Sequence, residues 1–350
     1  MTDQSKWTRR QFLSAAAATA AVAGFSGSVR AASKPSSLVY STYGGDFGNW
    51  MKQSFEVPFT KATGIDLVHD IGTNPARFAK MKAYRHHPRF QIINLQDRYL
   101  YESTRDGLLE KIDYSLVPNA SGFASDYKRP TWLGYMYFSI GIVYNADRVK
   151  NPPQKWSDLL DEKYKGRIFI DAFNHFGLHT LVAMSLANGG SYENMEPGFK
   201  LIHEIATRLN PRFISTSQEG MELLRTGQVD VAPWQDTRAF ILERQGHPIR
   251  YTIPESGDVS VVYGNGIVKN SGNVKWSEKF LNNTADSKLQ AKLISDYYPA
   301  SPTNPETQPS AKVEKLIARP PGAKQFTLDY SKILPRLSDW QDRWNKAIAR

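Results

Sequence analysis

The sequence predicts an α/β protein built as two lobes, and the order of its segments carries this prediction. Short β-branched and aromatic runs alternate with helically spaced segments over residues 37–95, and again over 168–232. Strand, helix, strand in succession is typical of a parallel sheet with crossover helices. Two longer extended runs, 135–144 and 259–268, each lie between two α/β blocks. We therefore expect the chain to cross between lobes there and to leave a cleft between them.

The first block contains the clearest alternation. Residues 37–43 predict a strand that ends at Gly44-Gly45. Helical spacing of four phenylalanine and methionine side chains follows, and Gly64 ends this helix. The remaining elements expected in this block are a strand at 65–68, a helix at 76–84 and a strand at 90–95.

The second block repeats the pattern after a loop with Pro152-Pro153. Its expected elements are a helix at 156–160, strands at 168–170 and 229–232, and a helix at 178–187. The chain beyond residue 268 is expected to be mostly helical.

The N-terminus has the pattern of a removable export signal. Arg9-Arg10 precede an alanine-rich apolar run, and the sequence Val29-Arg30-Ala31 supplies a small-x-small cleavage site. Paired arginines followed by Phe-Leu are typical of the twin-arginine route, although an ordinary secretory peptide is the alternative. Residues 1–31 are therefore interpreted as a twin-arginine-type signal of a protein that leaves a bacterial cytoplasm.

Composition excludes several classes of function. The chain has 350 residues, a formal net charge of +10 and no cysteine, so disulfides, thiol catalysis and thiolate metal sites are excluded. Its basic residues are scattered, with no run longer than Lys128-Arg129, which argues against nucleic-acid binding. Beyond residue 31 no apolar run approaches transmembrane length.

No enzyme signature stands out. The sequence has no Gly-x-Ser-x-Gly, His-Glu-x-x-His or phosphate-loop pattern. His86-His87 has no carboxylate nearby in sequence, and Tyr297-Tyr298 is a poor match to an iron-binding tyrosine pair. We expect no catalytic residue, no bound metal and no cofactor.

Five stretches together carry a family resemblance. They are residues 59–65, 140–145, 156–168, 227–230 and 298–304. The chain resembles the extracellular solute-binding proteins of ABC importers, in particular the spermidine/putrescine-binding branch. The resemblance implies a type II-like periplasmic-binding-protein fold with strand hinges. It also implies a first lobe of residues 35–141 plus 262–301 and a second lobe of 142–261 plus 302–350.

Ligand residues are carried over from the resemblance position by position. They are expected in the loops that border the cleft: Tyr43, Gly44, Asp46, Gln96, Asp97, Arg98, Tyr137, Phe173, Asn174, His175, Trp234, Asp236 and Tyr263. Each has a plainer alternative, such as a core position for Trp234, a surface salt bridge for Arg98 or a capping role for His175.

Departures from the family pattern concern charge. Polyamine binders hold ammonium groups with carboxylates, because a desolvated cation needs a paired charge. Two of those acidic positions are Phe173 and Phe176 here, and the Trp-x-Asp of the returning hinge strand is Val261-Val262-Tyr263. The remaining charges have both signs, which favours a zwitterionic or anionic solute.

The resemblance implies a periplasmic monomer that binds a small polar solute and delivers it to an ABC permease in the inner membrane. A true putrescine or spermidine binder is the main alternative. Two others are a ligand-presenting partner of a chemoreceptor or sensor, and a periplasmic enzyme on the same fold.

Overall fold

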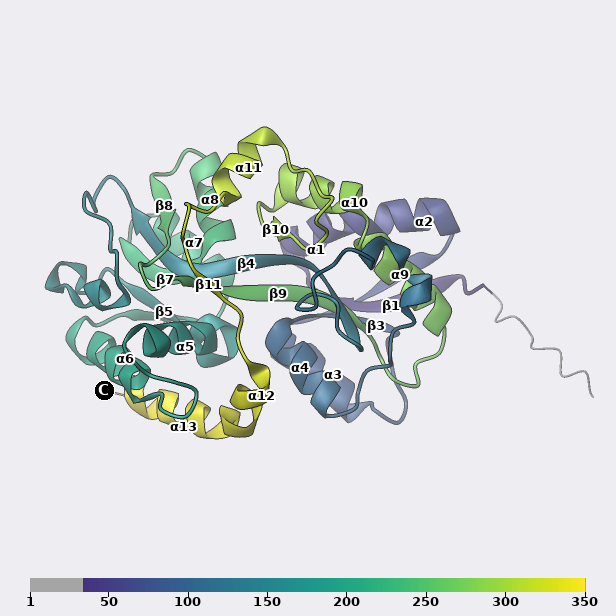
Figure 1. Cartoon of the computed structure of the whole chain (residues 1–350), viewed down its shortest axis with the longest axis horizontal. Coiled ribbons are helices and arrows are strands. Elements are labelled where there is room, and N and C mark those ends of the chain that lie inside the picture. The colour runs from purple at the N-terminus through teal and green to yellow at the C-terminus, as the bar shows by residue number, and fades with distance from the viewer. Residues whose placement is uncertain (1–33, 350) are drawn as a thin grey trace, which may run out of the picture. The chain divides into compact units, whose positions relative to one another are not determined.

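The computed structural model describes residues 34–349, so the predicted export signal lies outside the described residues. Within residues 34–349, no helix is long and apolar enough to cross a membrane. The fold is mixed α/β, as predicted, with a nine-stranded sheet and a separate two-stranded sheet (Figure 1).

The first group of elements forms a parallel sheet. β1 (Ser37–Thr42) lies between β2 (Asp66–Ile71) and β3 (Ile92–Gln96), and pairs with both in parallel. Crossover helices connect these strands: α1 (Gly45–Met51), a π-helical turn at Lys52–Glu56, α2 (Val57–Thr63) and α3 (Asn74–Ala83). Gly64 ends α2 at a φ of 67°, a conformation that favours glycine.

The chain then forms α4 and later returns to this group with further helices. α4 (Asp97–Arg105) begins directly after β3, where the sequence had predicted only a loop. Figure 1 shows α3 and α4 below the strands, and α1 and α2 above them. The other helical segments of this part are 3-10 turns at Tyr114–Leu116 and Pro118–Ala120, α9 (Val274–Thr284), α10 (Ser287–Lys292) and a π-helical turn at Leu293–Tyr297.

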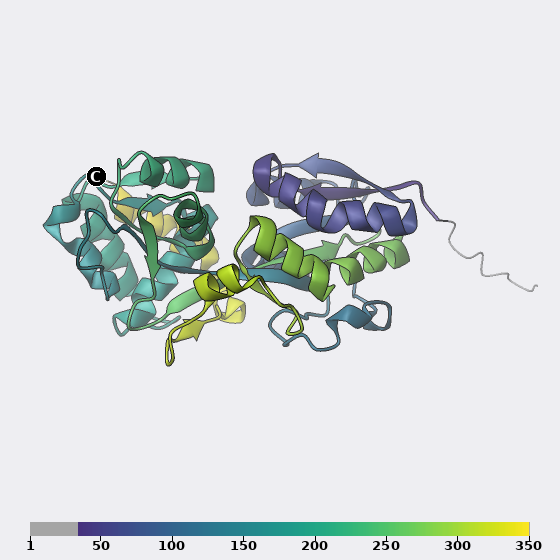
Figure 2. The same cartoon turned by 90° about the horizontal axis from the view of Figure 1, so that it is seen from above.

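Two long strands run through the middle of the sheet. β4 (Trp132–Asn145) and β9 (Asp258–Ile267) are antiparallel partners, and β9 also pairs with β3. The second half of β4 pairs instead with β7 (Val231–Gln235) and β8 (Ile249–Thr252). β4 therefore joins the two groups, and Figure 2 shows the strands passing between the purple and the teal elements.

The second group surrounds the other end of β4. β5 (Phe169–Asp171) pairs in parallel with β6 (Arg212–Ile214), and one bridge between Ile168 and Val231 ties this small sheet to β7. Its helical segments are 3-10 turns at Trp156–Leu160 and Glu162–Tyr164, a π-helical turn at Phe173–Gly177, α5 (Leu178–Ala187), α6 (Glu196–Arg208), α7 (Ser217–Arg225) and α8 (Asp236–Arg244).

The C-terminal segment contacts both groups. β10 (Ser301–Pro302) pairs with β4 and β11 (Gln325–Phe326) pairs with β9. The remaining elements are α11 (Ala311–Ile317), α12 (Tyr330–Ile333), a 3-10 turn at Leu334–Arg336 and α13 (Leu337–Ile348), which packs beside α6.

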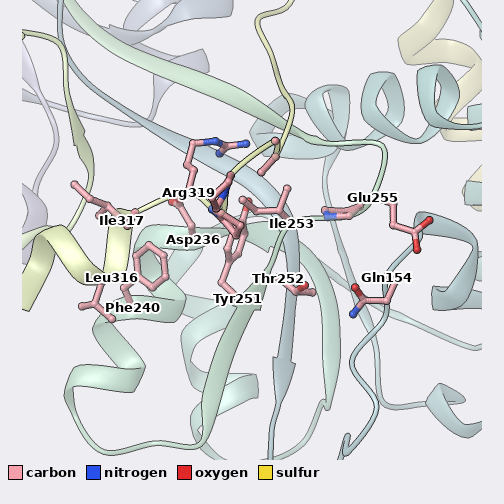
Figure 3. A pocket seen from close by; sticks show the side chains of 16 residues that line it. Gln154, Asp236, Phe240, Tyr251, Thr252, Ile253, Glu255, Leu316, Ile317 and Arg319 are labelled. Atoms are coloured by element: carbon pink, nitrogen blue, oxygen red, sulfur yellow. The ribbon is translucent and has the colours of Figure 1, made fainter.

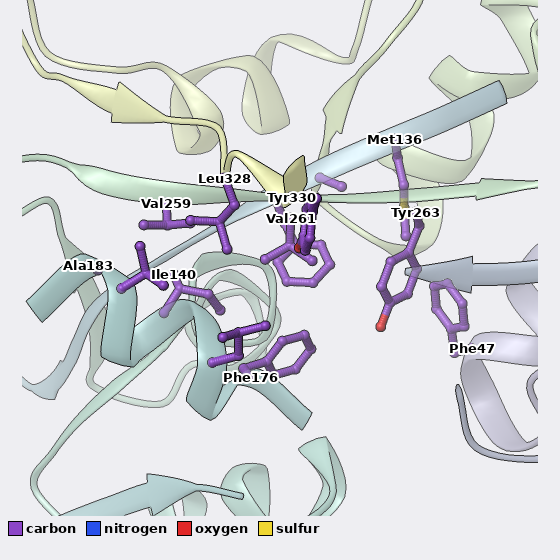
Figure 4. Close-up of a cluster of buried hydrophobic side chains, with 14 of the residues drawn as sticks. Phe47, Met136, Ile140, Phe176, Ala183, Val259, Val261, Tyr263, Leu328 and Tyr330 are labelled. Carbon is purple, nitrogen blue, oxygen red and sulfur yellow. The ribbon is translucent and has the colours of Figure 1, made fainter. Parts of the chain in front are cut away.

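The buried core continues along the crossing strands. Figure 4 shows Ile140 of β4 and Val259 of β9 among apolar side chains that include Leu328 and Phe176. Gly264 lies in the same strand as Val259. A Cβ at Gly264 would lie 2.8 Å from the Leu133 carbonyl oxygen, so close packing against β4 is itself a reason for glycine.

Candidate ligand-binding cleft

A cavity of about 660 Å³ lies where loops of the two groups face each other. This volume is in the range that small organic ligands occupy. It is lined by Tyr43, Gly44, Phe47, Ile71, Gly72, Thr73, Asn74, Pro75, Ala172, Asn174, His175, Ser215, Thr216, Ser217, Arg238, Tyr263 and Tyr298. We call this cavity the cleft.

Tyrosine side chains form one wall of the cleft. The ring of Tyr43 stacks on that of Tyr263, with centroids 5.5 Å apart and planes within 7°. Phe47 packs edge-on against Tyr263 and also against Tyr298, and Figure 4 shows Phe47 beside Tyr263. Burial raises the pKa of Tyr43 and raises that of Tyr263 well above its ordinary value. These phenols therefore stay neutral at physiological pH and offer hydroxyl groups on an apolar surface.

A buried arginine positions the loop before α3. The Arg77 guanidinium donates to the Gly72 carbonyl oxygen at 2.9 Å and to Asn74 Oδ1 at 3.3 Å, and lies 4.1 Å from the centre of the Tyr43 ring. Tyr43 donates its hydroxyl proton to the same Asn74 Oδ1 at 2.6 Å. Thr73 caps α3 by accepting from the Ala76 N–H. The cleft therefore meets the N-terminus of α3 in a fixed conformation.

The N-terminus of α7 borders the cleft from the second group. Thr216 and Glu219 form a capping box, in which Glu219 also accepts from the Ser215 N–H at 2.8 Å. These backbone hydrogen bonds lower the pKa of Glu219. Because the capping box fixes the loop, Ser215, Thr216 and Ser217 lie along the cleft with little freedom.

Arg238, on the first turns of α8, brings a positive charge to the cleft. Its guanidinium lies 5.1 Å from the centre of the Tyr298 ring and 5.8 Å from that of Trp50. Its Nε is buried with no hydrogen-bond partner among residues 34–349, while one terminal nitrogen lies 3.7 Å from the Met221 sulfur. Because Arg238 lines the cleft, an acid group on a ligand would give its guanidinium an acceptor.

His175 is held in one orientation on the wall of the cleft. Its Nδ1 lies 2.5 Å from Asp171 Oδ1, and its Nε2 lies 3.4 Å from Ser217 Oγ. Asp171 is fully buried, which raises its pKa, while the neighbouring His175 opposes that shift. Because the Asp171 carboxylate accepts from Nδ1, the His175 Nε2 is left to face Ser217.

The charges that reach the cleft favour an anion. Among the described residues that line it, arginine and histidine are the ionisable side chains other than tyrosine, and there is no aspartate or glutamate. The N-terminus of α3 adds partial positive charge, whereas the Glu219 carboxylate caps the N-terminus of α7. The arrangement can therefore hold a small organic acid between tyrosines.

Five of the thirteen side chains and loop positions expected from the sequence line the cleft. They are Tyr43, Gly44, Asn174, His175 and Tyr263. The other eight lie elsewhere, in three kinds of environment.

Gln96, Asp97 and Arg98 join the two groups instead of lining the cleft. Arg98 donates to Asn174 Oδ1 at 3.1 Å and pairs with Glu102, while Gln96 donates to the His175 carbonyl oxygen at 3.2 Å. Asp97 is buried and accepts from the Tyr330 hydroxyl at 2.8 Å and from the Val262 N–H at 3.2 Å.

Four more of the expected residues are in the core or on the outer surface. Trp234 is fully buried and packs edge-on against Phe169, with ring centres 5.4 Å apart. Phe173 is also buried. Tyr137 stacks on Tyr127, and Asp46 is exposed at the start of α1.

Asp236 lines a different cavity. This hinge-side cavity, of about 550 Å³, lies between the β8–β9 loop and the segment after α11 (Figure 3). There Arg319 makes two hydrogen bonds, of 2.8 and 2.9 Å, to the fully buried Asp258, which also accepts from the Tyr251 hydroxyl. Burial raises the pKa of Asp236 well above its ordinary value.

We predict that Asp236→Asn stabilises the protein at pH 7. Because the folded-state pKa is raised above the unfolded value of about 3.9, the wild type loses stability as pH rises between the two. Asparagine keeps an acceptor for the Thr237 N–H and removes the charge. Urea unfolding of both proteins from pH 4 to 8 should show a higher free energy of unfolding for Asp236→Asn, and this difference should shrink toward pH 4.

The matched control for this prediction is Asp113→Asn. Hydrogen bonds from Ser115 lower the pKa of Asp113, so its replacement should change the pH dependence in the opposite direction. Equal stability of Asp236→Asn and wild type across the whole range would contradict the expected cost of the buried charge.

Sequence reasoning missed that the Gly72–Pro75 loop, the Ser215–Ser217 loop and Arg238 line the cleft. The signals that could have found the loops were present as capping patterns: Thr73 before Asn74-Pro75, and Thr216 three residues before Glu219. The charge of Arg238 in the sequence is equally compatible with a solvated or ion-paired surface position. Its spacing one turn into a helix did not indicate which face of α8 borders the cleft.

Two α/β lobes joined by crossing strands, with a polar cavity between their loops, define a solute-binding protein with the periplasmic-binding-protein fold. The chain belongs to the bacterial extracellular solute-binding proteins, because the model of that family matches residues 92–321.

Individual relatives are distant but cover most of the chain. The spermidine/putrescine-binding periplasmic protein 1 of Haemophilus influenzae is 23% identical over 83% of this chain and 81% of its own. A putative 2-aminoethylphosphonate-binding periplasmic protein of Salmonella typhimurium is 22% identical over 88% and 91%. The crystal structure of an ABC transporter protein from Clostridium perfringens superposes with a TM-score of 0.72 at 25% identity, covering 89% of this chain and all of that one.

Proposed function

We propose that this protein is the periplasmic solute-binding component of an ABC importer and that it captures a small organic anion or zwitterion. The observation that carries the ligand class is Arg238, which lines a cleft with no described carboxylate and whose Nε has no hydrogen-bond partner among the described residues. A ligand acid group would supply the missing acceptor.

The same observation argues against a bare diamine. Two ammonium groups would need carboxylates in the cleft, whereas no described aspartate or glutamate lines it and Asp171 is buried behind His175. The names of the relatives are compatible with a cationic and with a zwitterionic ligand, since one names polyamines and another an aminophosphonate. A ligand that combines an acid with an amine or hydroxyl would use Arg238, the tyrosine hydroxyls and His175 together.

In this proposal the ligand is bound non-covalently and handed to an inner-membrane permease. The lobes comprise residues 35–141 plus 262–301 and 142–261 plus 302–350, with hinges in β4 and β9. Ligand contacts from both lobes bias the protein toward the closed form, which the permease recognises. Export by the twin-arginine route, a monomeric state and the absence of a cofactor belong to the same proposal.

The test is thermal unfolding of the protein without residues 1–31 against a panel of solutes. The panel contains aminophosphonates, sugar-acid and amino-acid conjugates, phosphorylated alcohols, putrescine and spermidine. We expect an anion or zwitterion to raise the unfolding midpoint, because ligand at 100 times its Kd adds about 2.7 kcal/mol of stability. A rise with polyamines alone would contradict the ligand class.

A further inference from the structure

The hydrogen bonds from Asp171 through His175 to Ser217 cross the cleft wall in a fixed order. Asp171 ends β5, His175 lies in the π-helical turn that follows, and Ser217 is the first residue of α7. The Nδ1 of His175 lies 2.5 Å from Asp171 Oδ1, and its Nε2 lies 3.4 Å from Ser217 Oγ. An acid, an imidazole and a hydroxyl in this order are the parts of an activated serine.

The direction of each hydrogen bond agrees with that role. Gln235 donates its side-chain N–H to Ser217 Oγ at 2.7 Å, so the Ser217 proton is free to point at His175 Nε2. The buried Asp171 accepts from Nδ1 and thereby fixes the tautomer whose Nε2 can accept a proton. The separation of 3.4 Å is longer than a tight hydrogen bond, as is common for catalytic pairs before a substrate binds.

Ser217 also lies where a developing negative charge would be stabilised. Both Ser217 and His175 line the cleft, so a ligand carbonyl can reach them. Ser217 is the first residue of a nine-residue helix in which the Glu219 N–H already donates to Thr216 Oγ1, and the N–H groups of Ser217 and Gln218 have no intrahelical partner. Those N–H groups are donors of the kind that hold an oxyanion.

We propose that Ser217 is a nucleophile that hydrolyses carboxylic esters bound in the cleft, an activity additional to solute capture. The Ser217 oxygen bonds to the ester carbonyl carbon as its proton passes to His175 Nε2. The carbon–oxygen bond to the alcohol then breaks, and His175 returns the proton to the leaving alkoxide oxygen. Water then bonds to the acyl carbon as its proton passes to His175 Nε2. The bond from that carbon to the Ser217 oxygen breaks, and His175 returns the proton to Ser217 Oγ, which releases the acid and free Ser217.

The substrate class follows from the rest of the cleft. The positive charge of Arg238 favours an ester that also bears an acid group, and the tyrosine wall favours an apolar segment between the two. A mono-ester of a dicarboxylic acid has these features.

Covalent labelling and turnover test the proposal in the purified protein. We expect a fluorophosphonate to modify Ser217, located by peptide mass spectrometry, and p-nitrophenyl acetate and the mono-p-nitrophenyl ester of succinic acid to be hydrolysed. Ser217→Ala should abolish labelling, and both Ser217→Ala and His175→Gln should lower hydrolysis about 100-fold or more. Ser157→Ala, an exposed serine far from these residues in sequence, is the matched control and should leave both unchanged.

Several outcomes would overturn the proposal. They are absence of labelling, labelling at other serines, or hydrolysis that Ser217→Ala retains while its unfolding midpoint equals that of the wild type. The midpoint also shows whether His175→Gln is folded. Solute-induced stabilisation of the wild type is measured separately, so failure of the esterase activity does not affect the test of solute capture.

Discussion

Trp234→Ala should lower the free energy of unfolding by about 3–5 kcal/mol, the cost of truncating a fully buried aromatic side chain. Trp234 packs edge-on against Phe169, and a Cβ on Gly220 would lie 2.6 Å from its ring, so the site is filled on both sides. Surrounding residues cannot collapse fully into the space that the ring leaves. Urea unfolding monitored by circular dichroism measures the loss.

Trp276→Ala is the matched control for this variant. Trp276 is partly exposed on α9, so its truncation should cost much less. Folded Trp234→Ala should bind the solute identified in the thermal panel with unchanged affinity, because the ring does not reach the cleft. Unchanged stability together with lost affinity would instead place Trp234 in the ligand site.

Arg238→Gln should weaken binding of the anionic solute by about 10- to 100-fold, because a hydrogen bond to a charged group contributes about 1.5–3 kcal/mol. Arg238→Lys should recover part of that loss, since lysine restores the charge but not the planar donor set. Isothermal titration calorimetry with the solute from the thermal panel measures each affinity.

Arg225→Gln is the matched control, because Arg225 is exposed on α7 and pairs with Glu222. It should leave affinity unchanged. Full affinity in Arg238→Gln would mean that the Arg238 guanidinium does not bind the ligand. If Arg225→Gln weakened binding as much, a diffuse field of basic residues would explain the effect better than one guanidinium.

Local sequence pattern predicted the elements whose periodicity is strong. The strands β1, β4, β5 and β9 and the helix α5 lie close to their expected ranges, because alternating or helical apolar spacing reflects which side chains face the core. The start of α4 was missed. Asp97 and Arg98 were assigned to a loop because their polarity resembled a cleft edge, whereas the fold uses them in the first turn of a buried helix.

The candidate site was less accessible from the sequence. Tyr43, Asn174 and His175 were predicted at the cleft because they follow strands, and strand ends of an open α/β sheet border its ligand crevice; all three line the cavity. Trp234 and Asp236 also lie at a strand end, yet one faces the core and the other a hinge-side cavity. A displacement of one or two residues changes the face of a strand or helix, and sequence order alone does not fix that face.

The sequence by itself determined the α/β class, the crossing strands and the absence of cysteine chemistry, because composition and periodicity are local properties of the chain. The tertiary structure decided which polar groups meet. It placed Arg238 of α8 opposite the tyrosines of the first group, and brought Ser217 within 3.4 Å of His175, 42 residues away. Such contacts depend on how packed elements are oriented, which is a property of the whole core.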